Sequence, residues 1–435
     1  MRAGIILAGL AWLAAGVAQA QTAVVTKLDD GRYVPPYDRA LDVHTGGRMQ
    51  SDVVWMDKVD DPCPASKRVR KHGQWVYPPI QVCTPPADYP VATHYQTYAF
   101  GWPGVYFESR FKGDEVVLRF DDPTSDFELL LDGQPVHRFS RPGETIFDIT
   151  GLTFADHTVR LERLSEDLTT GGAFSGFFIP TGTLWTGVLT PPPEPHRIGT
   201  PLPLPPSRSR RIEFIGDSYL TGYGVHSPKH ECTPEELHAN TDTQVAWGAL
   251  IARHYDADYQ INATSGIGMV RNYDGSTGAL MPERYASDLM STKVDIHAYR
   301  TQMDSPVLSW QPQVIVIGLG DNDFATPVKP GEKWADQAAL RGDFITTYLT
   351  FLKNLRARNP KAQIILMDYG EPELIPDIQA IAAMSKARGD GNVIAWSAGT
   401  GFEQSGCDWH LSPNDHVRIA AGIEAVIDAQ PDVWK

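Results

Sequence analysis

One serine, one histidine and one aspartate in this sequence have the side chains that acyl transfer by a hydroxyl group requires. Ser218 follows the apolar run "RIEFIG" in the stretch Gly216-Asp217-Ser218, and Asp408 and His410 lie near the carboxyl end of the chain in "GCDWH". A serine needs a base, because its own proton is held too tightly at neutral pH. The base needs a partner that fixes its tautomer. We therefore expect Ser218 as nucleophile, His410 as base and Asp408 as the partner of the base.

Acyl transfer also needs preorganised hydrogen-bond donors for the negative oxygen of the tetrahedral intermediate. The candidates are the backbone N–H groups of Ser218 and Gly266 and the side-chain amide of Asn322. Asn322 would equally suit a helix cap or a turn. His416 is a rival base, but we expect it inside the last helix and therefore favour His410.

Other residues of these segments have weaker claims to a role. Asp217 is expected to bond the surrounding loops rather than to take part in chemistry. Trp409, Tyr219 and Arg271 are candidates for substrate binding, although aromatic side chains more often pack in a core. The sequence has no H-E-x-x-H motif or paired C-x-x-C, and "DNDF" lacks the spacing of a calcium loop. We predict no metal and no cofactor.

A parallel sheet would bring these distant residues together. Uniformly apolar runs, typical of strands buried on both faces, predict strands at 211–216, 259–264, 314–320, 363–369 and 392–398. Helices are expected between them, at 243–255, 335–358, 373–388 and 413–428. The alternation predicts a three-layer α/β fold with a doubly wound parallel sheet. Such sheets bind ligands at the carboxyl ends of their strands, where Ser218, Asn322 and His410 are expected.

The chain before this α/β region has a different pattern. Within 85–190, short runs such as "EVVLRF" and "TVRLERL" alternate with period two, and Asp132-Gly133 marks a hairpin, so we expect an antiparallel β-sandwich. A stretch at 191–206 with eight prolines predicts a linker, placed at 191–210, before a catalytic domain at 211–435. Residues 21–84 form an extension that could pad the sandwich or remain irregular.

The first twenty residues have the features of a secretory signal. Arg2 precedes an apolar stretch that ends at the small-residue site Ala18-Gln19-Ala20. A membrane anchor is the alternative, but the apolar stretch falls short of the ~20 residues that a span needs. We predict a signal peptide at 1–20 and a secreted or periplasmic protein. The formal charge of −15 argues against nucleic acid or an anionic membrane as partner.

Export makes the four cysteines candidates for two disulfides. Three pairings are possible. Cys63–Cys83 is local in sequence and would close a loop, which leaves Cys232–Cys407 as a long-range link. The alternative is free buried thiols, and we favour the disulfides.

The motifs Gly216-Asp217-Ser218, Gly266, Gly320-x-Asn322-Asp323 and Asp408-x-His410, in this order, resemble the SGNH/GDSL hydrolase superfamily. The longer stretches "IEFIGDSYLTGYG", "SGIGMVRNYDG", "MPERY", "LGDNDF" and "GCDWH" are similar to carbohydrate esterase family 2, which contains acetylxylan esterases and glucomannan deacetylases. Upstream, "FESRFKGDEVVLRF", "LLLDGQPV" and "HTVRLERL" resemble the N-terminal jelly-roll domain of that family. The resemblance covers about residues 90–430 and leaves 21–84 outside.

The resemblance implies a flavodoxin-like catalytic domain that removes acetyl groups from plant hemicellulose, with preference for the 6-hydroxyl of pyranose sugars. It gives Ser218, His410 and Asp408 the roles derived above, although some members lack the acid and orient the histidine with a backbone carbonyl. The expected partner is an acetylated polysaccharide or oligosaccharide. The sequence does not fix the oligomeric state, and we favour a monomer. Alternatives are an esterase for another acylated glycan or a lipid, and a non-catalytic carbohydrate-binding protein.

Two departures from the superfamily pattern concern residues beside the site. Asp321 stands where threonine is usual, which adds a carboxylate near Asn322 and bears on the pH dependence. Leu411 follows the histidine where proline is common.

Overall fold

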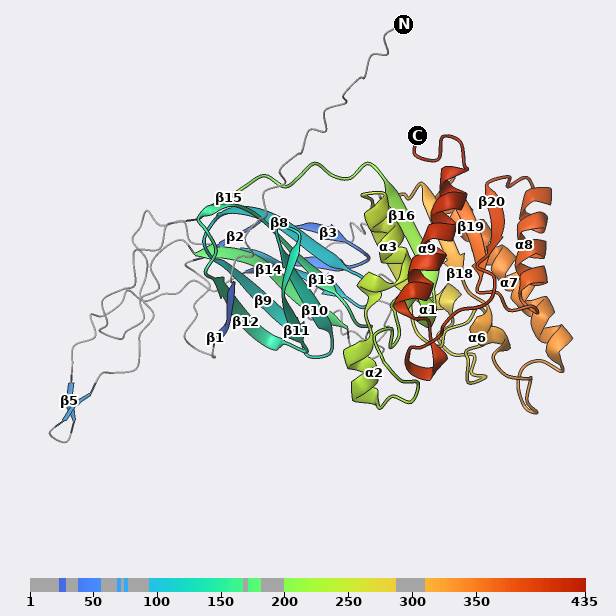
Figure 1. The fold of residues 1–435 in the computed structure, drawn as a ribbon, viewed down its shortest axis with the longest axis horizontal. Helices are drawn as coiled ribbons and strands as arrows, with labels where there is room; N and C mark the ends of the chain where they lie inside the picture. The colour runs from blue at the N-terminus through green and yellow to red at the C-terminus, as the bar shows by residue number, and fades with distance from the viewer. Residues whose placement is uncertain are drawn as a thin grey trace, which may run out of the picture.

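The computed structural model describes residues 23–28, 38–55, 69–71, 74–76, 94–166, 171–180, 199–286 and 310–435. The predicted signal peptide and the predicted Cys63–Cys83 disulfide lie outside these ranges. The described chain forms a β-sandwich and an α/β domain that lie against each other (Figure 1). None of the helices in the described ranges combines the length and the apolarity that crossing a bilayer requires.

The β-sandwich consists of two antiparallel sheets. The first has the order β1 (Val24–Leu28), β12 (Gly143–Thr150), β9 (Val116–Asp122), β14 (Gly172–Pro180), β7 (His94–Phe100) and β4 (Gln50–Trp55), with β2 (Asp38–Ala40) paired to β14. The second has the order β11 (Gln134–Ser140), β10 (Asp126–Leu131), β13 (Ala155–Arg163), β8 (Tyr106–Gly113) and β15 (Thr200–Pro201), with β3 (His44–Gly46) paired to β8. A separate hairpin joins β5 (Val69–Lys71) and β6 (Gln74–Val76). The antiparallel sandwich matches the prediction, whereas its jelly-roll connectivity stays a prediction.

Period-two alternation places the core of the sandwich as expected. Val116, Leu118 and Phe120 of β9 point into one apolar core that both sheets share. The predicted hairpin at Asp132-Gly133 joins β10 to β11, and both residues have positive φ, which aspartate tolerates and glycine favours. Strands β1 to β4 come from the extension at 21–84 and belong to the sandwich, whereas β5 and β6 of the same extension pair only with each other.

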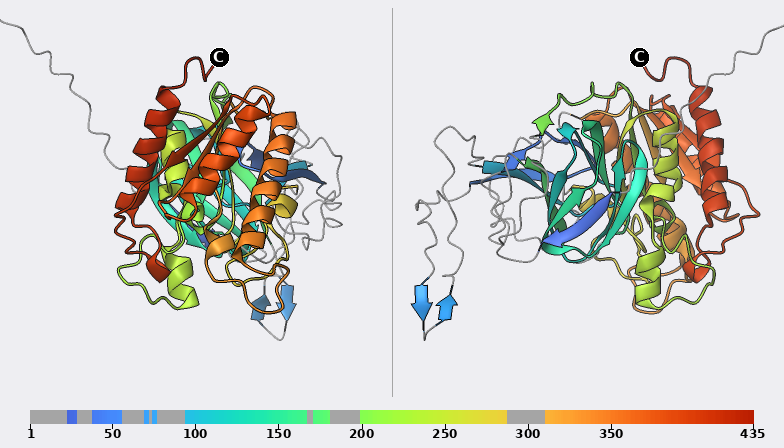
Figure 2. Two further views of the ribbon diagram at one scale, coloured as in Figure 1. Left: turned by 90° about the vertical axis from the view of Figure 1, so that its right-hand side faces the viewer. Right: turned by 60° about the vertical axis from the view of Figure 1, so that its left-hand side comes forward.

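The α/β domain contains a five-stranded parallel sheet. Its order is β17 (Asp258–Ala263), β16 (Arg211–Gly216), β18 (Val314–Gly318), β19 (Gln363–Asp368) and β20 (Val393–Ser397). Helices α3 (Trp247–His254) and α9 (Pro413–Asp428) cover one face, and α7 (Gln337–Arg358) and α8 (Ile375–Ala387) cover the other (Figure 2). Numbered along the chain, the order is 2-1-3-4-5, that of a flavodoxin-like doubly wound sheet. The predicted three-layer architecture is confirmed.

Short helices surround the carboxyl end of this sheet. They are α1 (Ser218–Thr221), α2 (Pro234–Asn240), η2 (Thr243–Val245), α4 (Met281–Arg284), α6 (Asp321–Phe324) and η3 (Cys407–Trp409). The prediction of a single helix at 243–255 is wrong, because Ala246 is extended and separates η2 from α3. At the start of η2, the backbone N–H of Thr243 donates to the carbonyl of Leu164, at the end of the sandwich, at 2.7 Å.

The two domains share a closely packed interface. Trp102, in the turn between β7 and β8, is fully buried among core residues of the α/β domain. Tyr106 of β8 packs its ring 4.9 Å from the ring of Tyr259 and donates to Asp258 at 2.7 Å. The buried Arg48 bonds Glu213 of β16 at 3.2 Å. The sandwich is therefore packed directly against the α/β domain, with side chains of both in one interface.

Candidate active site

Ser218 lies at the carboxyl end of strand β16, which lies between β17 and β18, and is the first residue of α1. Asp217 begins this turn, and its carboxylate accepts the backbone N–H of Tyr219 at 3.1 Å. A side chain at Gly216 would come within 3.0 Å of Leu220 and 3.3 Å of the carbonyl of Gly318, so a tight fit requires glycine here. Asp217 thus has the loop-holding role that the sequence indicates.

His410 lies against the turn that carries Ser218. Its ring centroid is 5.2 Å from that of Tyr219 and 4.2 Å from that of Tyr223. Its Nδ1 is 2.9 Å from the carbonyl oxygen of Cys407. Because a carbonyl oxygen only accepts, Nδ1 carries the hydrogen, and the lone pair is on Nε2. Burial lowers the pKa of His410, which favours the neutral form that a base needs.

Asp408 does not make the contact with His410 that the sequence predicts. Asp408 and Trp409 both have left-handed backbone conformations, with φ of 49° and 59°. The Asp408 carboxylate accepts instead from the hydroxyl of Tyr223 at 2.8 Å. The carbonyl of Cys407 therefore replaces the side chain of Asp408 as the group that fixes the tautomer. The negative charge of Asp408 still acts on the imidazole, since it raises the pKa of His410 against the effect of burial.

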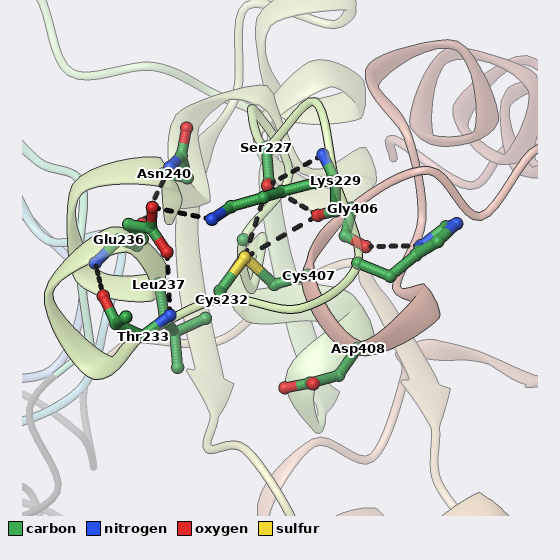
Figure 3. Close-up of a disulfide and its surroundings, with 12 residues drawn as sticks. Ser227, Lys229, Cys232, Thr233, Glu236, Leu237, Asn240, Gly406, Cys407 and Asp408 are labelled. Carbon is green, nitrogen blue, oxygen red and sulfur yellow. Dashed lines mark hydrogen bonds and ion pairs between the residues drawn. A yellow bond between two sulfur atoms is a disulfide. The ribbon is translucent and has the colours of Figure 1, made fainter.

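The predicted disulfide Cys232–Cys407 is confirmed and holds this turn (Figure 3). Cys407 is fully buried, and its N–H donates to the carbonyl of Gly224 at 3.2 Å. The N–H of Asp408 donates to the carbonyl of His230 at 2.7 Å. The turn that orients the histidine is therefore anchored both to the segment after Ser218 and to the segment before α2.

Two of the expected oxyanion donors are backbone groups with no competing partner. Gly266 has φ of +76°, and a side chain there would come within 2.7 Å of the ring of Tyr273. Within the described ranges, no backbone or side-chain acceptor bonds the N–H of Ser218 or of Gly266. Both groups are thus available to a ligand oxygen.

The third expected donor, Asn322, is engaged within the protein. Its amide nitrogen donates to the carbonyl of Ile267 at 2.9 Å and to Asp217 at 3.1 Å. An amide has two N–H groups, so both are used in this arrangement. Asn322 ties the nucleophile turn to the loop that carries Gly266, and donation to an oxyanion would need one of these contacts to give way.

Arg271 is not available for substrate binding, contrary to the prediction from its sequence context. Its side chain is 0% exposed, and the guanidinium bonds Glu332 at 2.8 Å and 2.9 Å as well as Thr326. Its backbone N–H, with those of Met269 and Val270, donates to the carboxylate of Asp323. These residues brace the loop after β17 instead of contacting solvent.

The aromatic residues divide into an exposed and an enclosed group. Trp409 is 57% exposed and stacks on His230 with ring centroids 4.7 Å apart, and Tyr273, beside Gly266, is 60% exposed. Tyr219 is partly buried between Tyr369 and His410 and forms a wall of the site. Flat exposed rings suit the apolar faces of sugars, so Trp409 keeps its expected role as a proposal.

The rival base His416 lies inside α9, away from Ser218. It is buried, its Nδ1 accepts the N–H of Trp247 at 3.3 Å, and burial lowers its pKa to about 3. Among the described residues, no group of three or more histidine, cysteine, aspartate or glutamate side chains is arranged to hold a metal ion.

A cluster of buried carboxyl groups lies behind Ser218. Burial, and then the charge of Glu371, raises the pKa of Asp217 and of Asp321. In the described part of the chain, both side-chain oxygens of Asp321 and one of Glu371 are buried without a hydrogen-bond partner. The residue that departs from the superfamily pattern is thus the centre of this cluster.

Residue types alone do not identify the group that orients the base, because the carbonyl of Cys407 is a backbone atom. The family resemblance did offer this arrangement, since some members orient the histidine with a backbone carbonyl. The position of Cys407 next to Asp408, as a disulfide candidate, was a second hint.

Two family models match the chain: carbohydrate esterase 2 N-terminal over residues 91–192, and the GDSL-like lipase/acylhydrolase family over 214–396. An acetylxylan esterase / glucomannan deacetylase of Cellvibrio japonicus is 37% identical over 354 residues, which are 80% of this chain and 89% of that protein.

Solved structures agree with these matches. One of them is a carbohydrate esterase whose active site is reported to have divergent catalytic and non-catalytic binding functions. It is 33% identical to this chain with a TM-score of 0.68, and the match covers 91% of this chain and all of that one. A family two carbohydrate esterase of Clostridium thermocellum, solved with cellohexaose, is 26% identical with a TM-score of 0.61, over 76% of this chain and 94% of that one. The chain belongs to carbohydrate esterase family 2 and is a carboxylic ester hydrolase of the GDSL type.

Proposed function

We propose that this protein is exported and removes acetyl groups from plant hemicellulose, acetylated glucomannan or xylan, at the 6-hydroxyl of the sugar, through an acetyl-Ser218 intermediate. The observation that carries the chemistry is the bond between His410 Nδ1 and the carbonyl of Cys407, because it leaves Nε2 as an unprotonated base beside the nucleophile turn. The substrate class is supported by the 37% identical Cellvibrio relative, whose name includes both deacetylations.

In the first half-reaction, the hydroxyl oxygen of Ser218 attacks the acetyl carbonyl carbon while Nε2 of His410 takes the hydroxyl proton. The N–H groups of Ser218 and Gly266 bind the resulting oxyanion, joined by Asn322 if its amide exchanges a partner. The tetrahedral intermediate then expels the sugar oxygen, which takes the proton from the imidazolium.

In the second half-reaction, His410 removes a proton from water, and the water oxygen attacks the acetyl-Ser218 ester. Collapse of this second intermediate returns the proton to Ser218 and releases acetate. Asp408 stabilises the imidazolium by its charge in both half-reactions. The low pKa of His410 keeps the base neutral at the start of each.

Acetate release measured side by side from acetylated glucomannan, acetylated xylan and acetylated peptidoglycan tests the substrate class. We expect release from the hemicelluloses at rates at least ten times those on peptidoglycan, from the wild type and not from Ser218→Ala. The reverse preference would move the enzyme to another acylated glycan.

Glycan binding without turnover is the second candidate function. The exposed Trp409, stacked on His230, favours it, as does the cellohexaose found in the solved Clostridium relative. Binding of an unacetylated glucan that disappears in Trp409→Ala, from a wild type that releases no acetate, would support this candidate.

A further inference from the structure

A carboxylate at the end of the β-sandwich reaches the loop that carries the expected oxyanion donor Gly266. Glu166 lies three residues after the end of β13 at Arg163, and one of its carboxylate oxygens accepts the backbone N–H of Ser265 at 2.9 Å. The other oxygen accepts the hydroxyl of the same Ser265. Ser265 is the residue immediately before Gly266, so the Glu166 carboxylate bonds the residue next to the expected donor, the N–H of Gly266.

The same contact reaches the nucleophile turn. The hydroxyl of Ser265 lies 3.3 Å from that of Thr221, the last residue of α1, and the Thr221 hydroxyl donates to the carbonyl of Ser218 at 3.1 Å. Glu166, Ser265 and Thr221 therefore link the two backbone segments that carry the expected oxyanion donors, the N–H groups of Ser218 and Gly266. Asn322 links the same two segments at another place, between Asp217 and Ile267.

The segment that ends at Glu166 is held firmly enough to position another group. The carbonyl of Leu164 accepts the N–H of Thr243 at 2.7 Å, and the carbonyl of Arg163 accepts from the side chain of Gln244 at 3.3 Å. Arg163 is itself fully buried, with bonds to the carbonyls of Gly101 and Trp102, both at 2.8 Å. This segment is thus fixed in both domains.

We propose that Glu166 is a positioning residue of the esterase reaction, by which the β-sandwich holds the oxyanion loop in register with Ser218. The inference rests on the proposed function. It gives the sandwich a part in catalysis that does not require it to touch the substrate. Two hydrogen bonds to one carboxylate fix both the position and the rotation of the Ser265 peptide, and hence the direction of the next N–H.

The consequence is specific to the transition state. Oxyanion donors bind the developing negative charge more strongly than the ground-state carbonyl, so a displaced donor lowers kcat and leaves KM almost unchanged. A misplacement of about 1 Å in an active site costs up to about 100-fold in rate. Loss of general stability would instead lower the unfolding temperature without separating kcat from KM.

The test compares Glu166→Ala with Ser265→Ala, with their double variant, and with Glu108→Ala. Glu108 is a matched control, because it is another sandwich carboxylate at the interface, bonded to Arg208 at 2.8 Å and 2.9 Å and distant from the oxyanion loop in its contacts. Each variant is assayed for kcat and KM on an aryl acetate, and for thermal unfolding. The rate of Ser218 phosphonylation by an aryl phosphonate is followed by intact mass, since this adduct places a P–O⁻ oxygen at the donors and displaces the aryl oxide.

We expect Glu166→Ala to lower kcat and the phosphonylation rate by about 10- to 100-fold, with KM within about 3-fold. The double variant should lose no more than Glu166→Ala alone, because Glu166→Ala already removes both bonds to Ser265. Glu108→Ala should stay within about 3-fold of the wild type in kcat and in phosphonylation rate.

Retention of kcat and phosphonylation within about 3-fold in Glu166→Ala would overturn the inference. Equal losses of kcat in Glu166→Ala and Glu108→Ala, in proportion to their losses of unfolding temperature, would also overturn it. A wild type without esterase activity, or an active Ser218→Ala, would overturn the proposed function instead. In that event the phosphonylation rates still decide whether Glu166 positions the loop.

Discussion

At the scale of single residues, the ring of the neutral base His410 is oriented by a backbone carbonyl, and the expected acid Asp408 bonds another residue. The carbonyl of Cys407 fixes the tautomer of His410, whereas the carboxylate of Asp408 accepts a hydrogen bond from the hydroxyl of Tyr223. The sequence predicted Ser218, His410 and Asp408 by type and order, but it predicted the wrong partner for Nδ1. The left-handed turn at Asp408 and Trp409 decides this, and neither residue type announces such a turn.

The first prediction concerns the relative weight of the base and the acid. Asp408→Asn should lower kcat by less than about 10-fold, whereas His410→Ala should lower it by about 10⁴-fold or more. Asp408 raises the pKa of His410, so Asp408→Asn should also move the acid limb of the kcat/KM profile to lower pH. Rate profiles from pH 4 to 9 measure both effects. A larger loss in Asp408→Asn than in His410→Ala would mean that the base is misassigned.

The second prediction concerns Asp321 and stability. Burial and neighbouring carboxylates raise its pKa in the folded protein, so the folded state binds more protons than the unfolded state and loses stability as pH rises. Asp321→Asn removes this charge and supplies an N–H that can meet Glu371. It should stabilise the protein by about 1–3 kcal/mol at pH 8 and by much less at pH 4.

Denaturant unfolding of wild type and Asp321→Asn at both pH values measures this difference. Asp390→Asn is a matched control, since Asp390 pairs with Arg356 at 2.8 Å, outside the cluster. A stabilisation that is equal at pH 4 and pH 8 would contradict the account.

At the scale of elements, the parallel sheet was predictable and the turns at its carboxyl edge were not. Strand β16 and helix α9 have the bounds that apolar runs and helical spacing indicate, and the helices predicted at 335–358 and 373–388 begin and end within two residues of expectation. The failure at Arg271 has a tertiary cause, because Glu332 and the carbonyl of Asp323 bond its guanidinium in the interior. Sequence patterns report local preference and burial, not contacts between distant segments.

The third prediction concerns the turn η3 and its disulfide. Cys232→Ala/Cys407→Ala removes a link between residues 175 apart in sequence. We expect a loss of about 2–5 kcal/mol in unfolding free energy. We also expect a fall in kcat, because the carbonyl that orients His410 belongs to Cys407. Unfolding curves and aryl acetate kinetics measure the two effects, and unchanged kcat at a temperature where the variant is fully folded would show that η3 holds its shape without the link.

At the scale of the whole molecule, the sandwich and the α/β domain form one packed body. The core of the α/β domain includes Trp102 of the sandwich, and Arg48 bonds Glu213 in the interior strand β16. The change of pattern at the Pro-rich stretch indicated two domains, and the structure describes two. Their shared core was not predictable, because no periodicity distinguishes Trp102 from a residue of the sandwich core.

The fourth prediction tests this shared core. Trp102→Ala should cost about 3–5 kcal/mol, as expected for a fully buried tryptophan. Far-ultraviolet circular dichroism, which reports on both domains, should show a single unfolding transition. In Trp102→Ala this whole transition should move to lower temperature. Phe139→Ala, which removes a core side chain from the sandwich alone, is the comparison. Two separate transitions, with only that of the sandwich shifted in Trp102→Ala, would contradict the shared core.

The central claim is that Ser218 forms the covalent acyl intermediate, and the turnover of an aryl acetate by Ser218→Ala tests it most directly. The account predicts a fall of about 10⁴- to 10⁶-fold in kcat, with an unfolding temperature close to that of the wild type. Near-normal hydrolysis by the folded variant would contradict it.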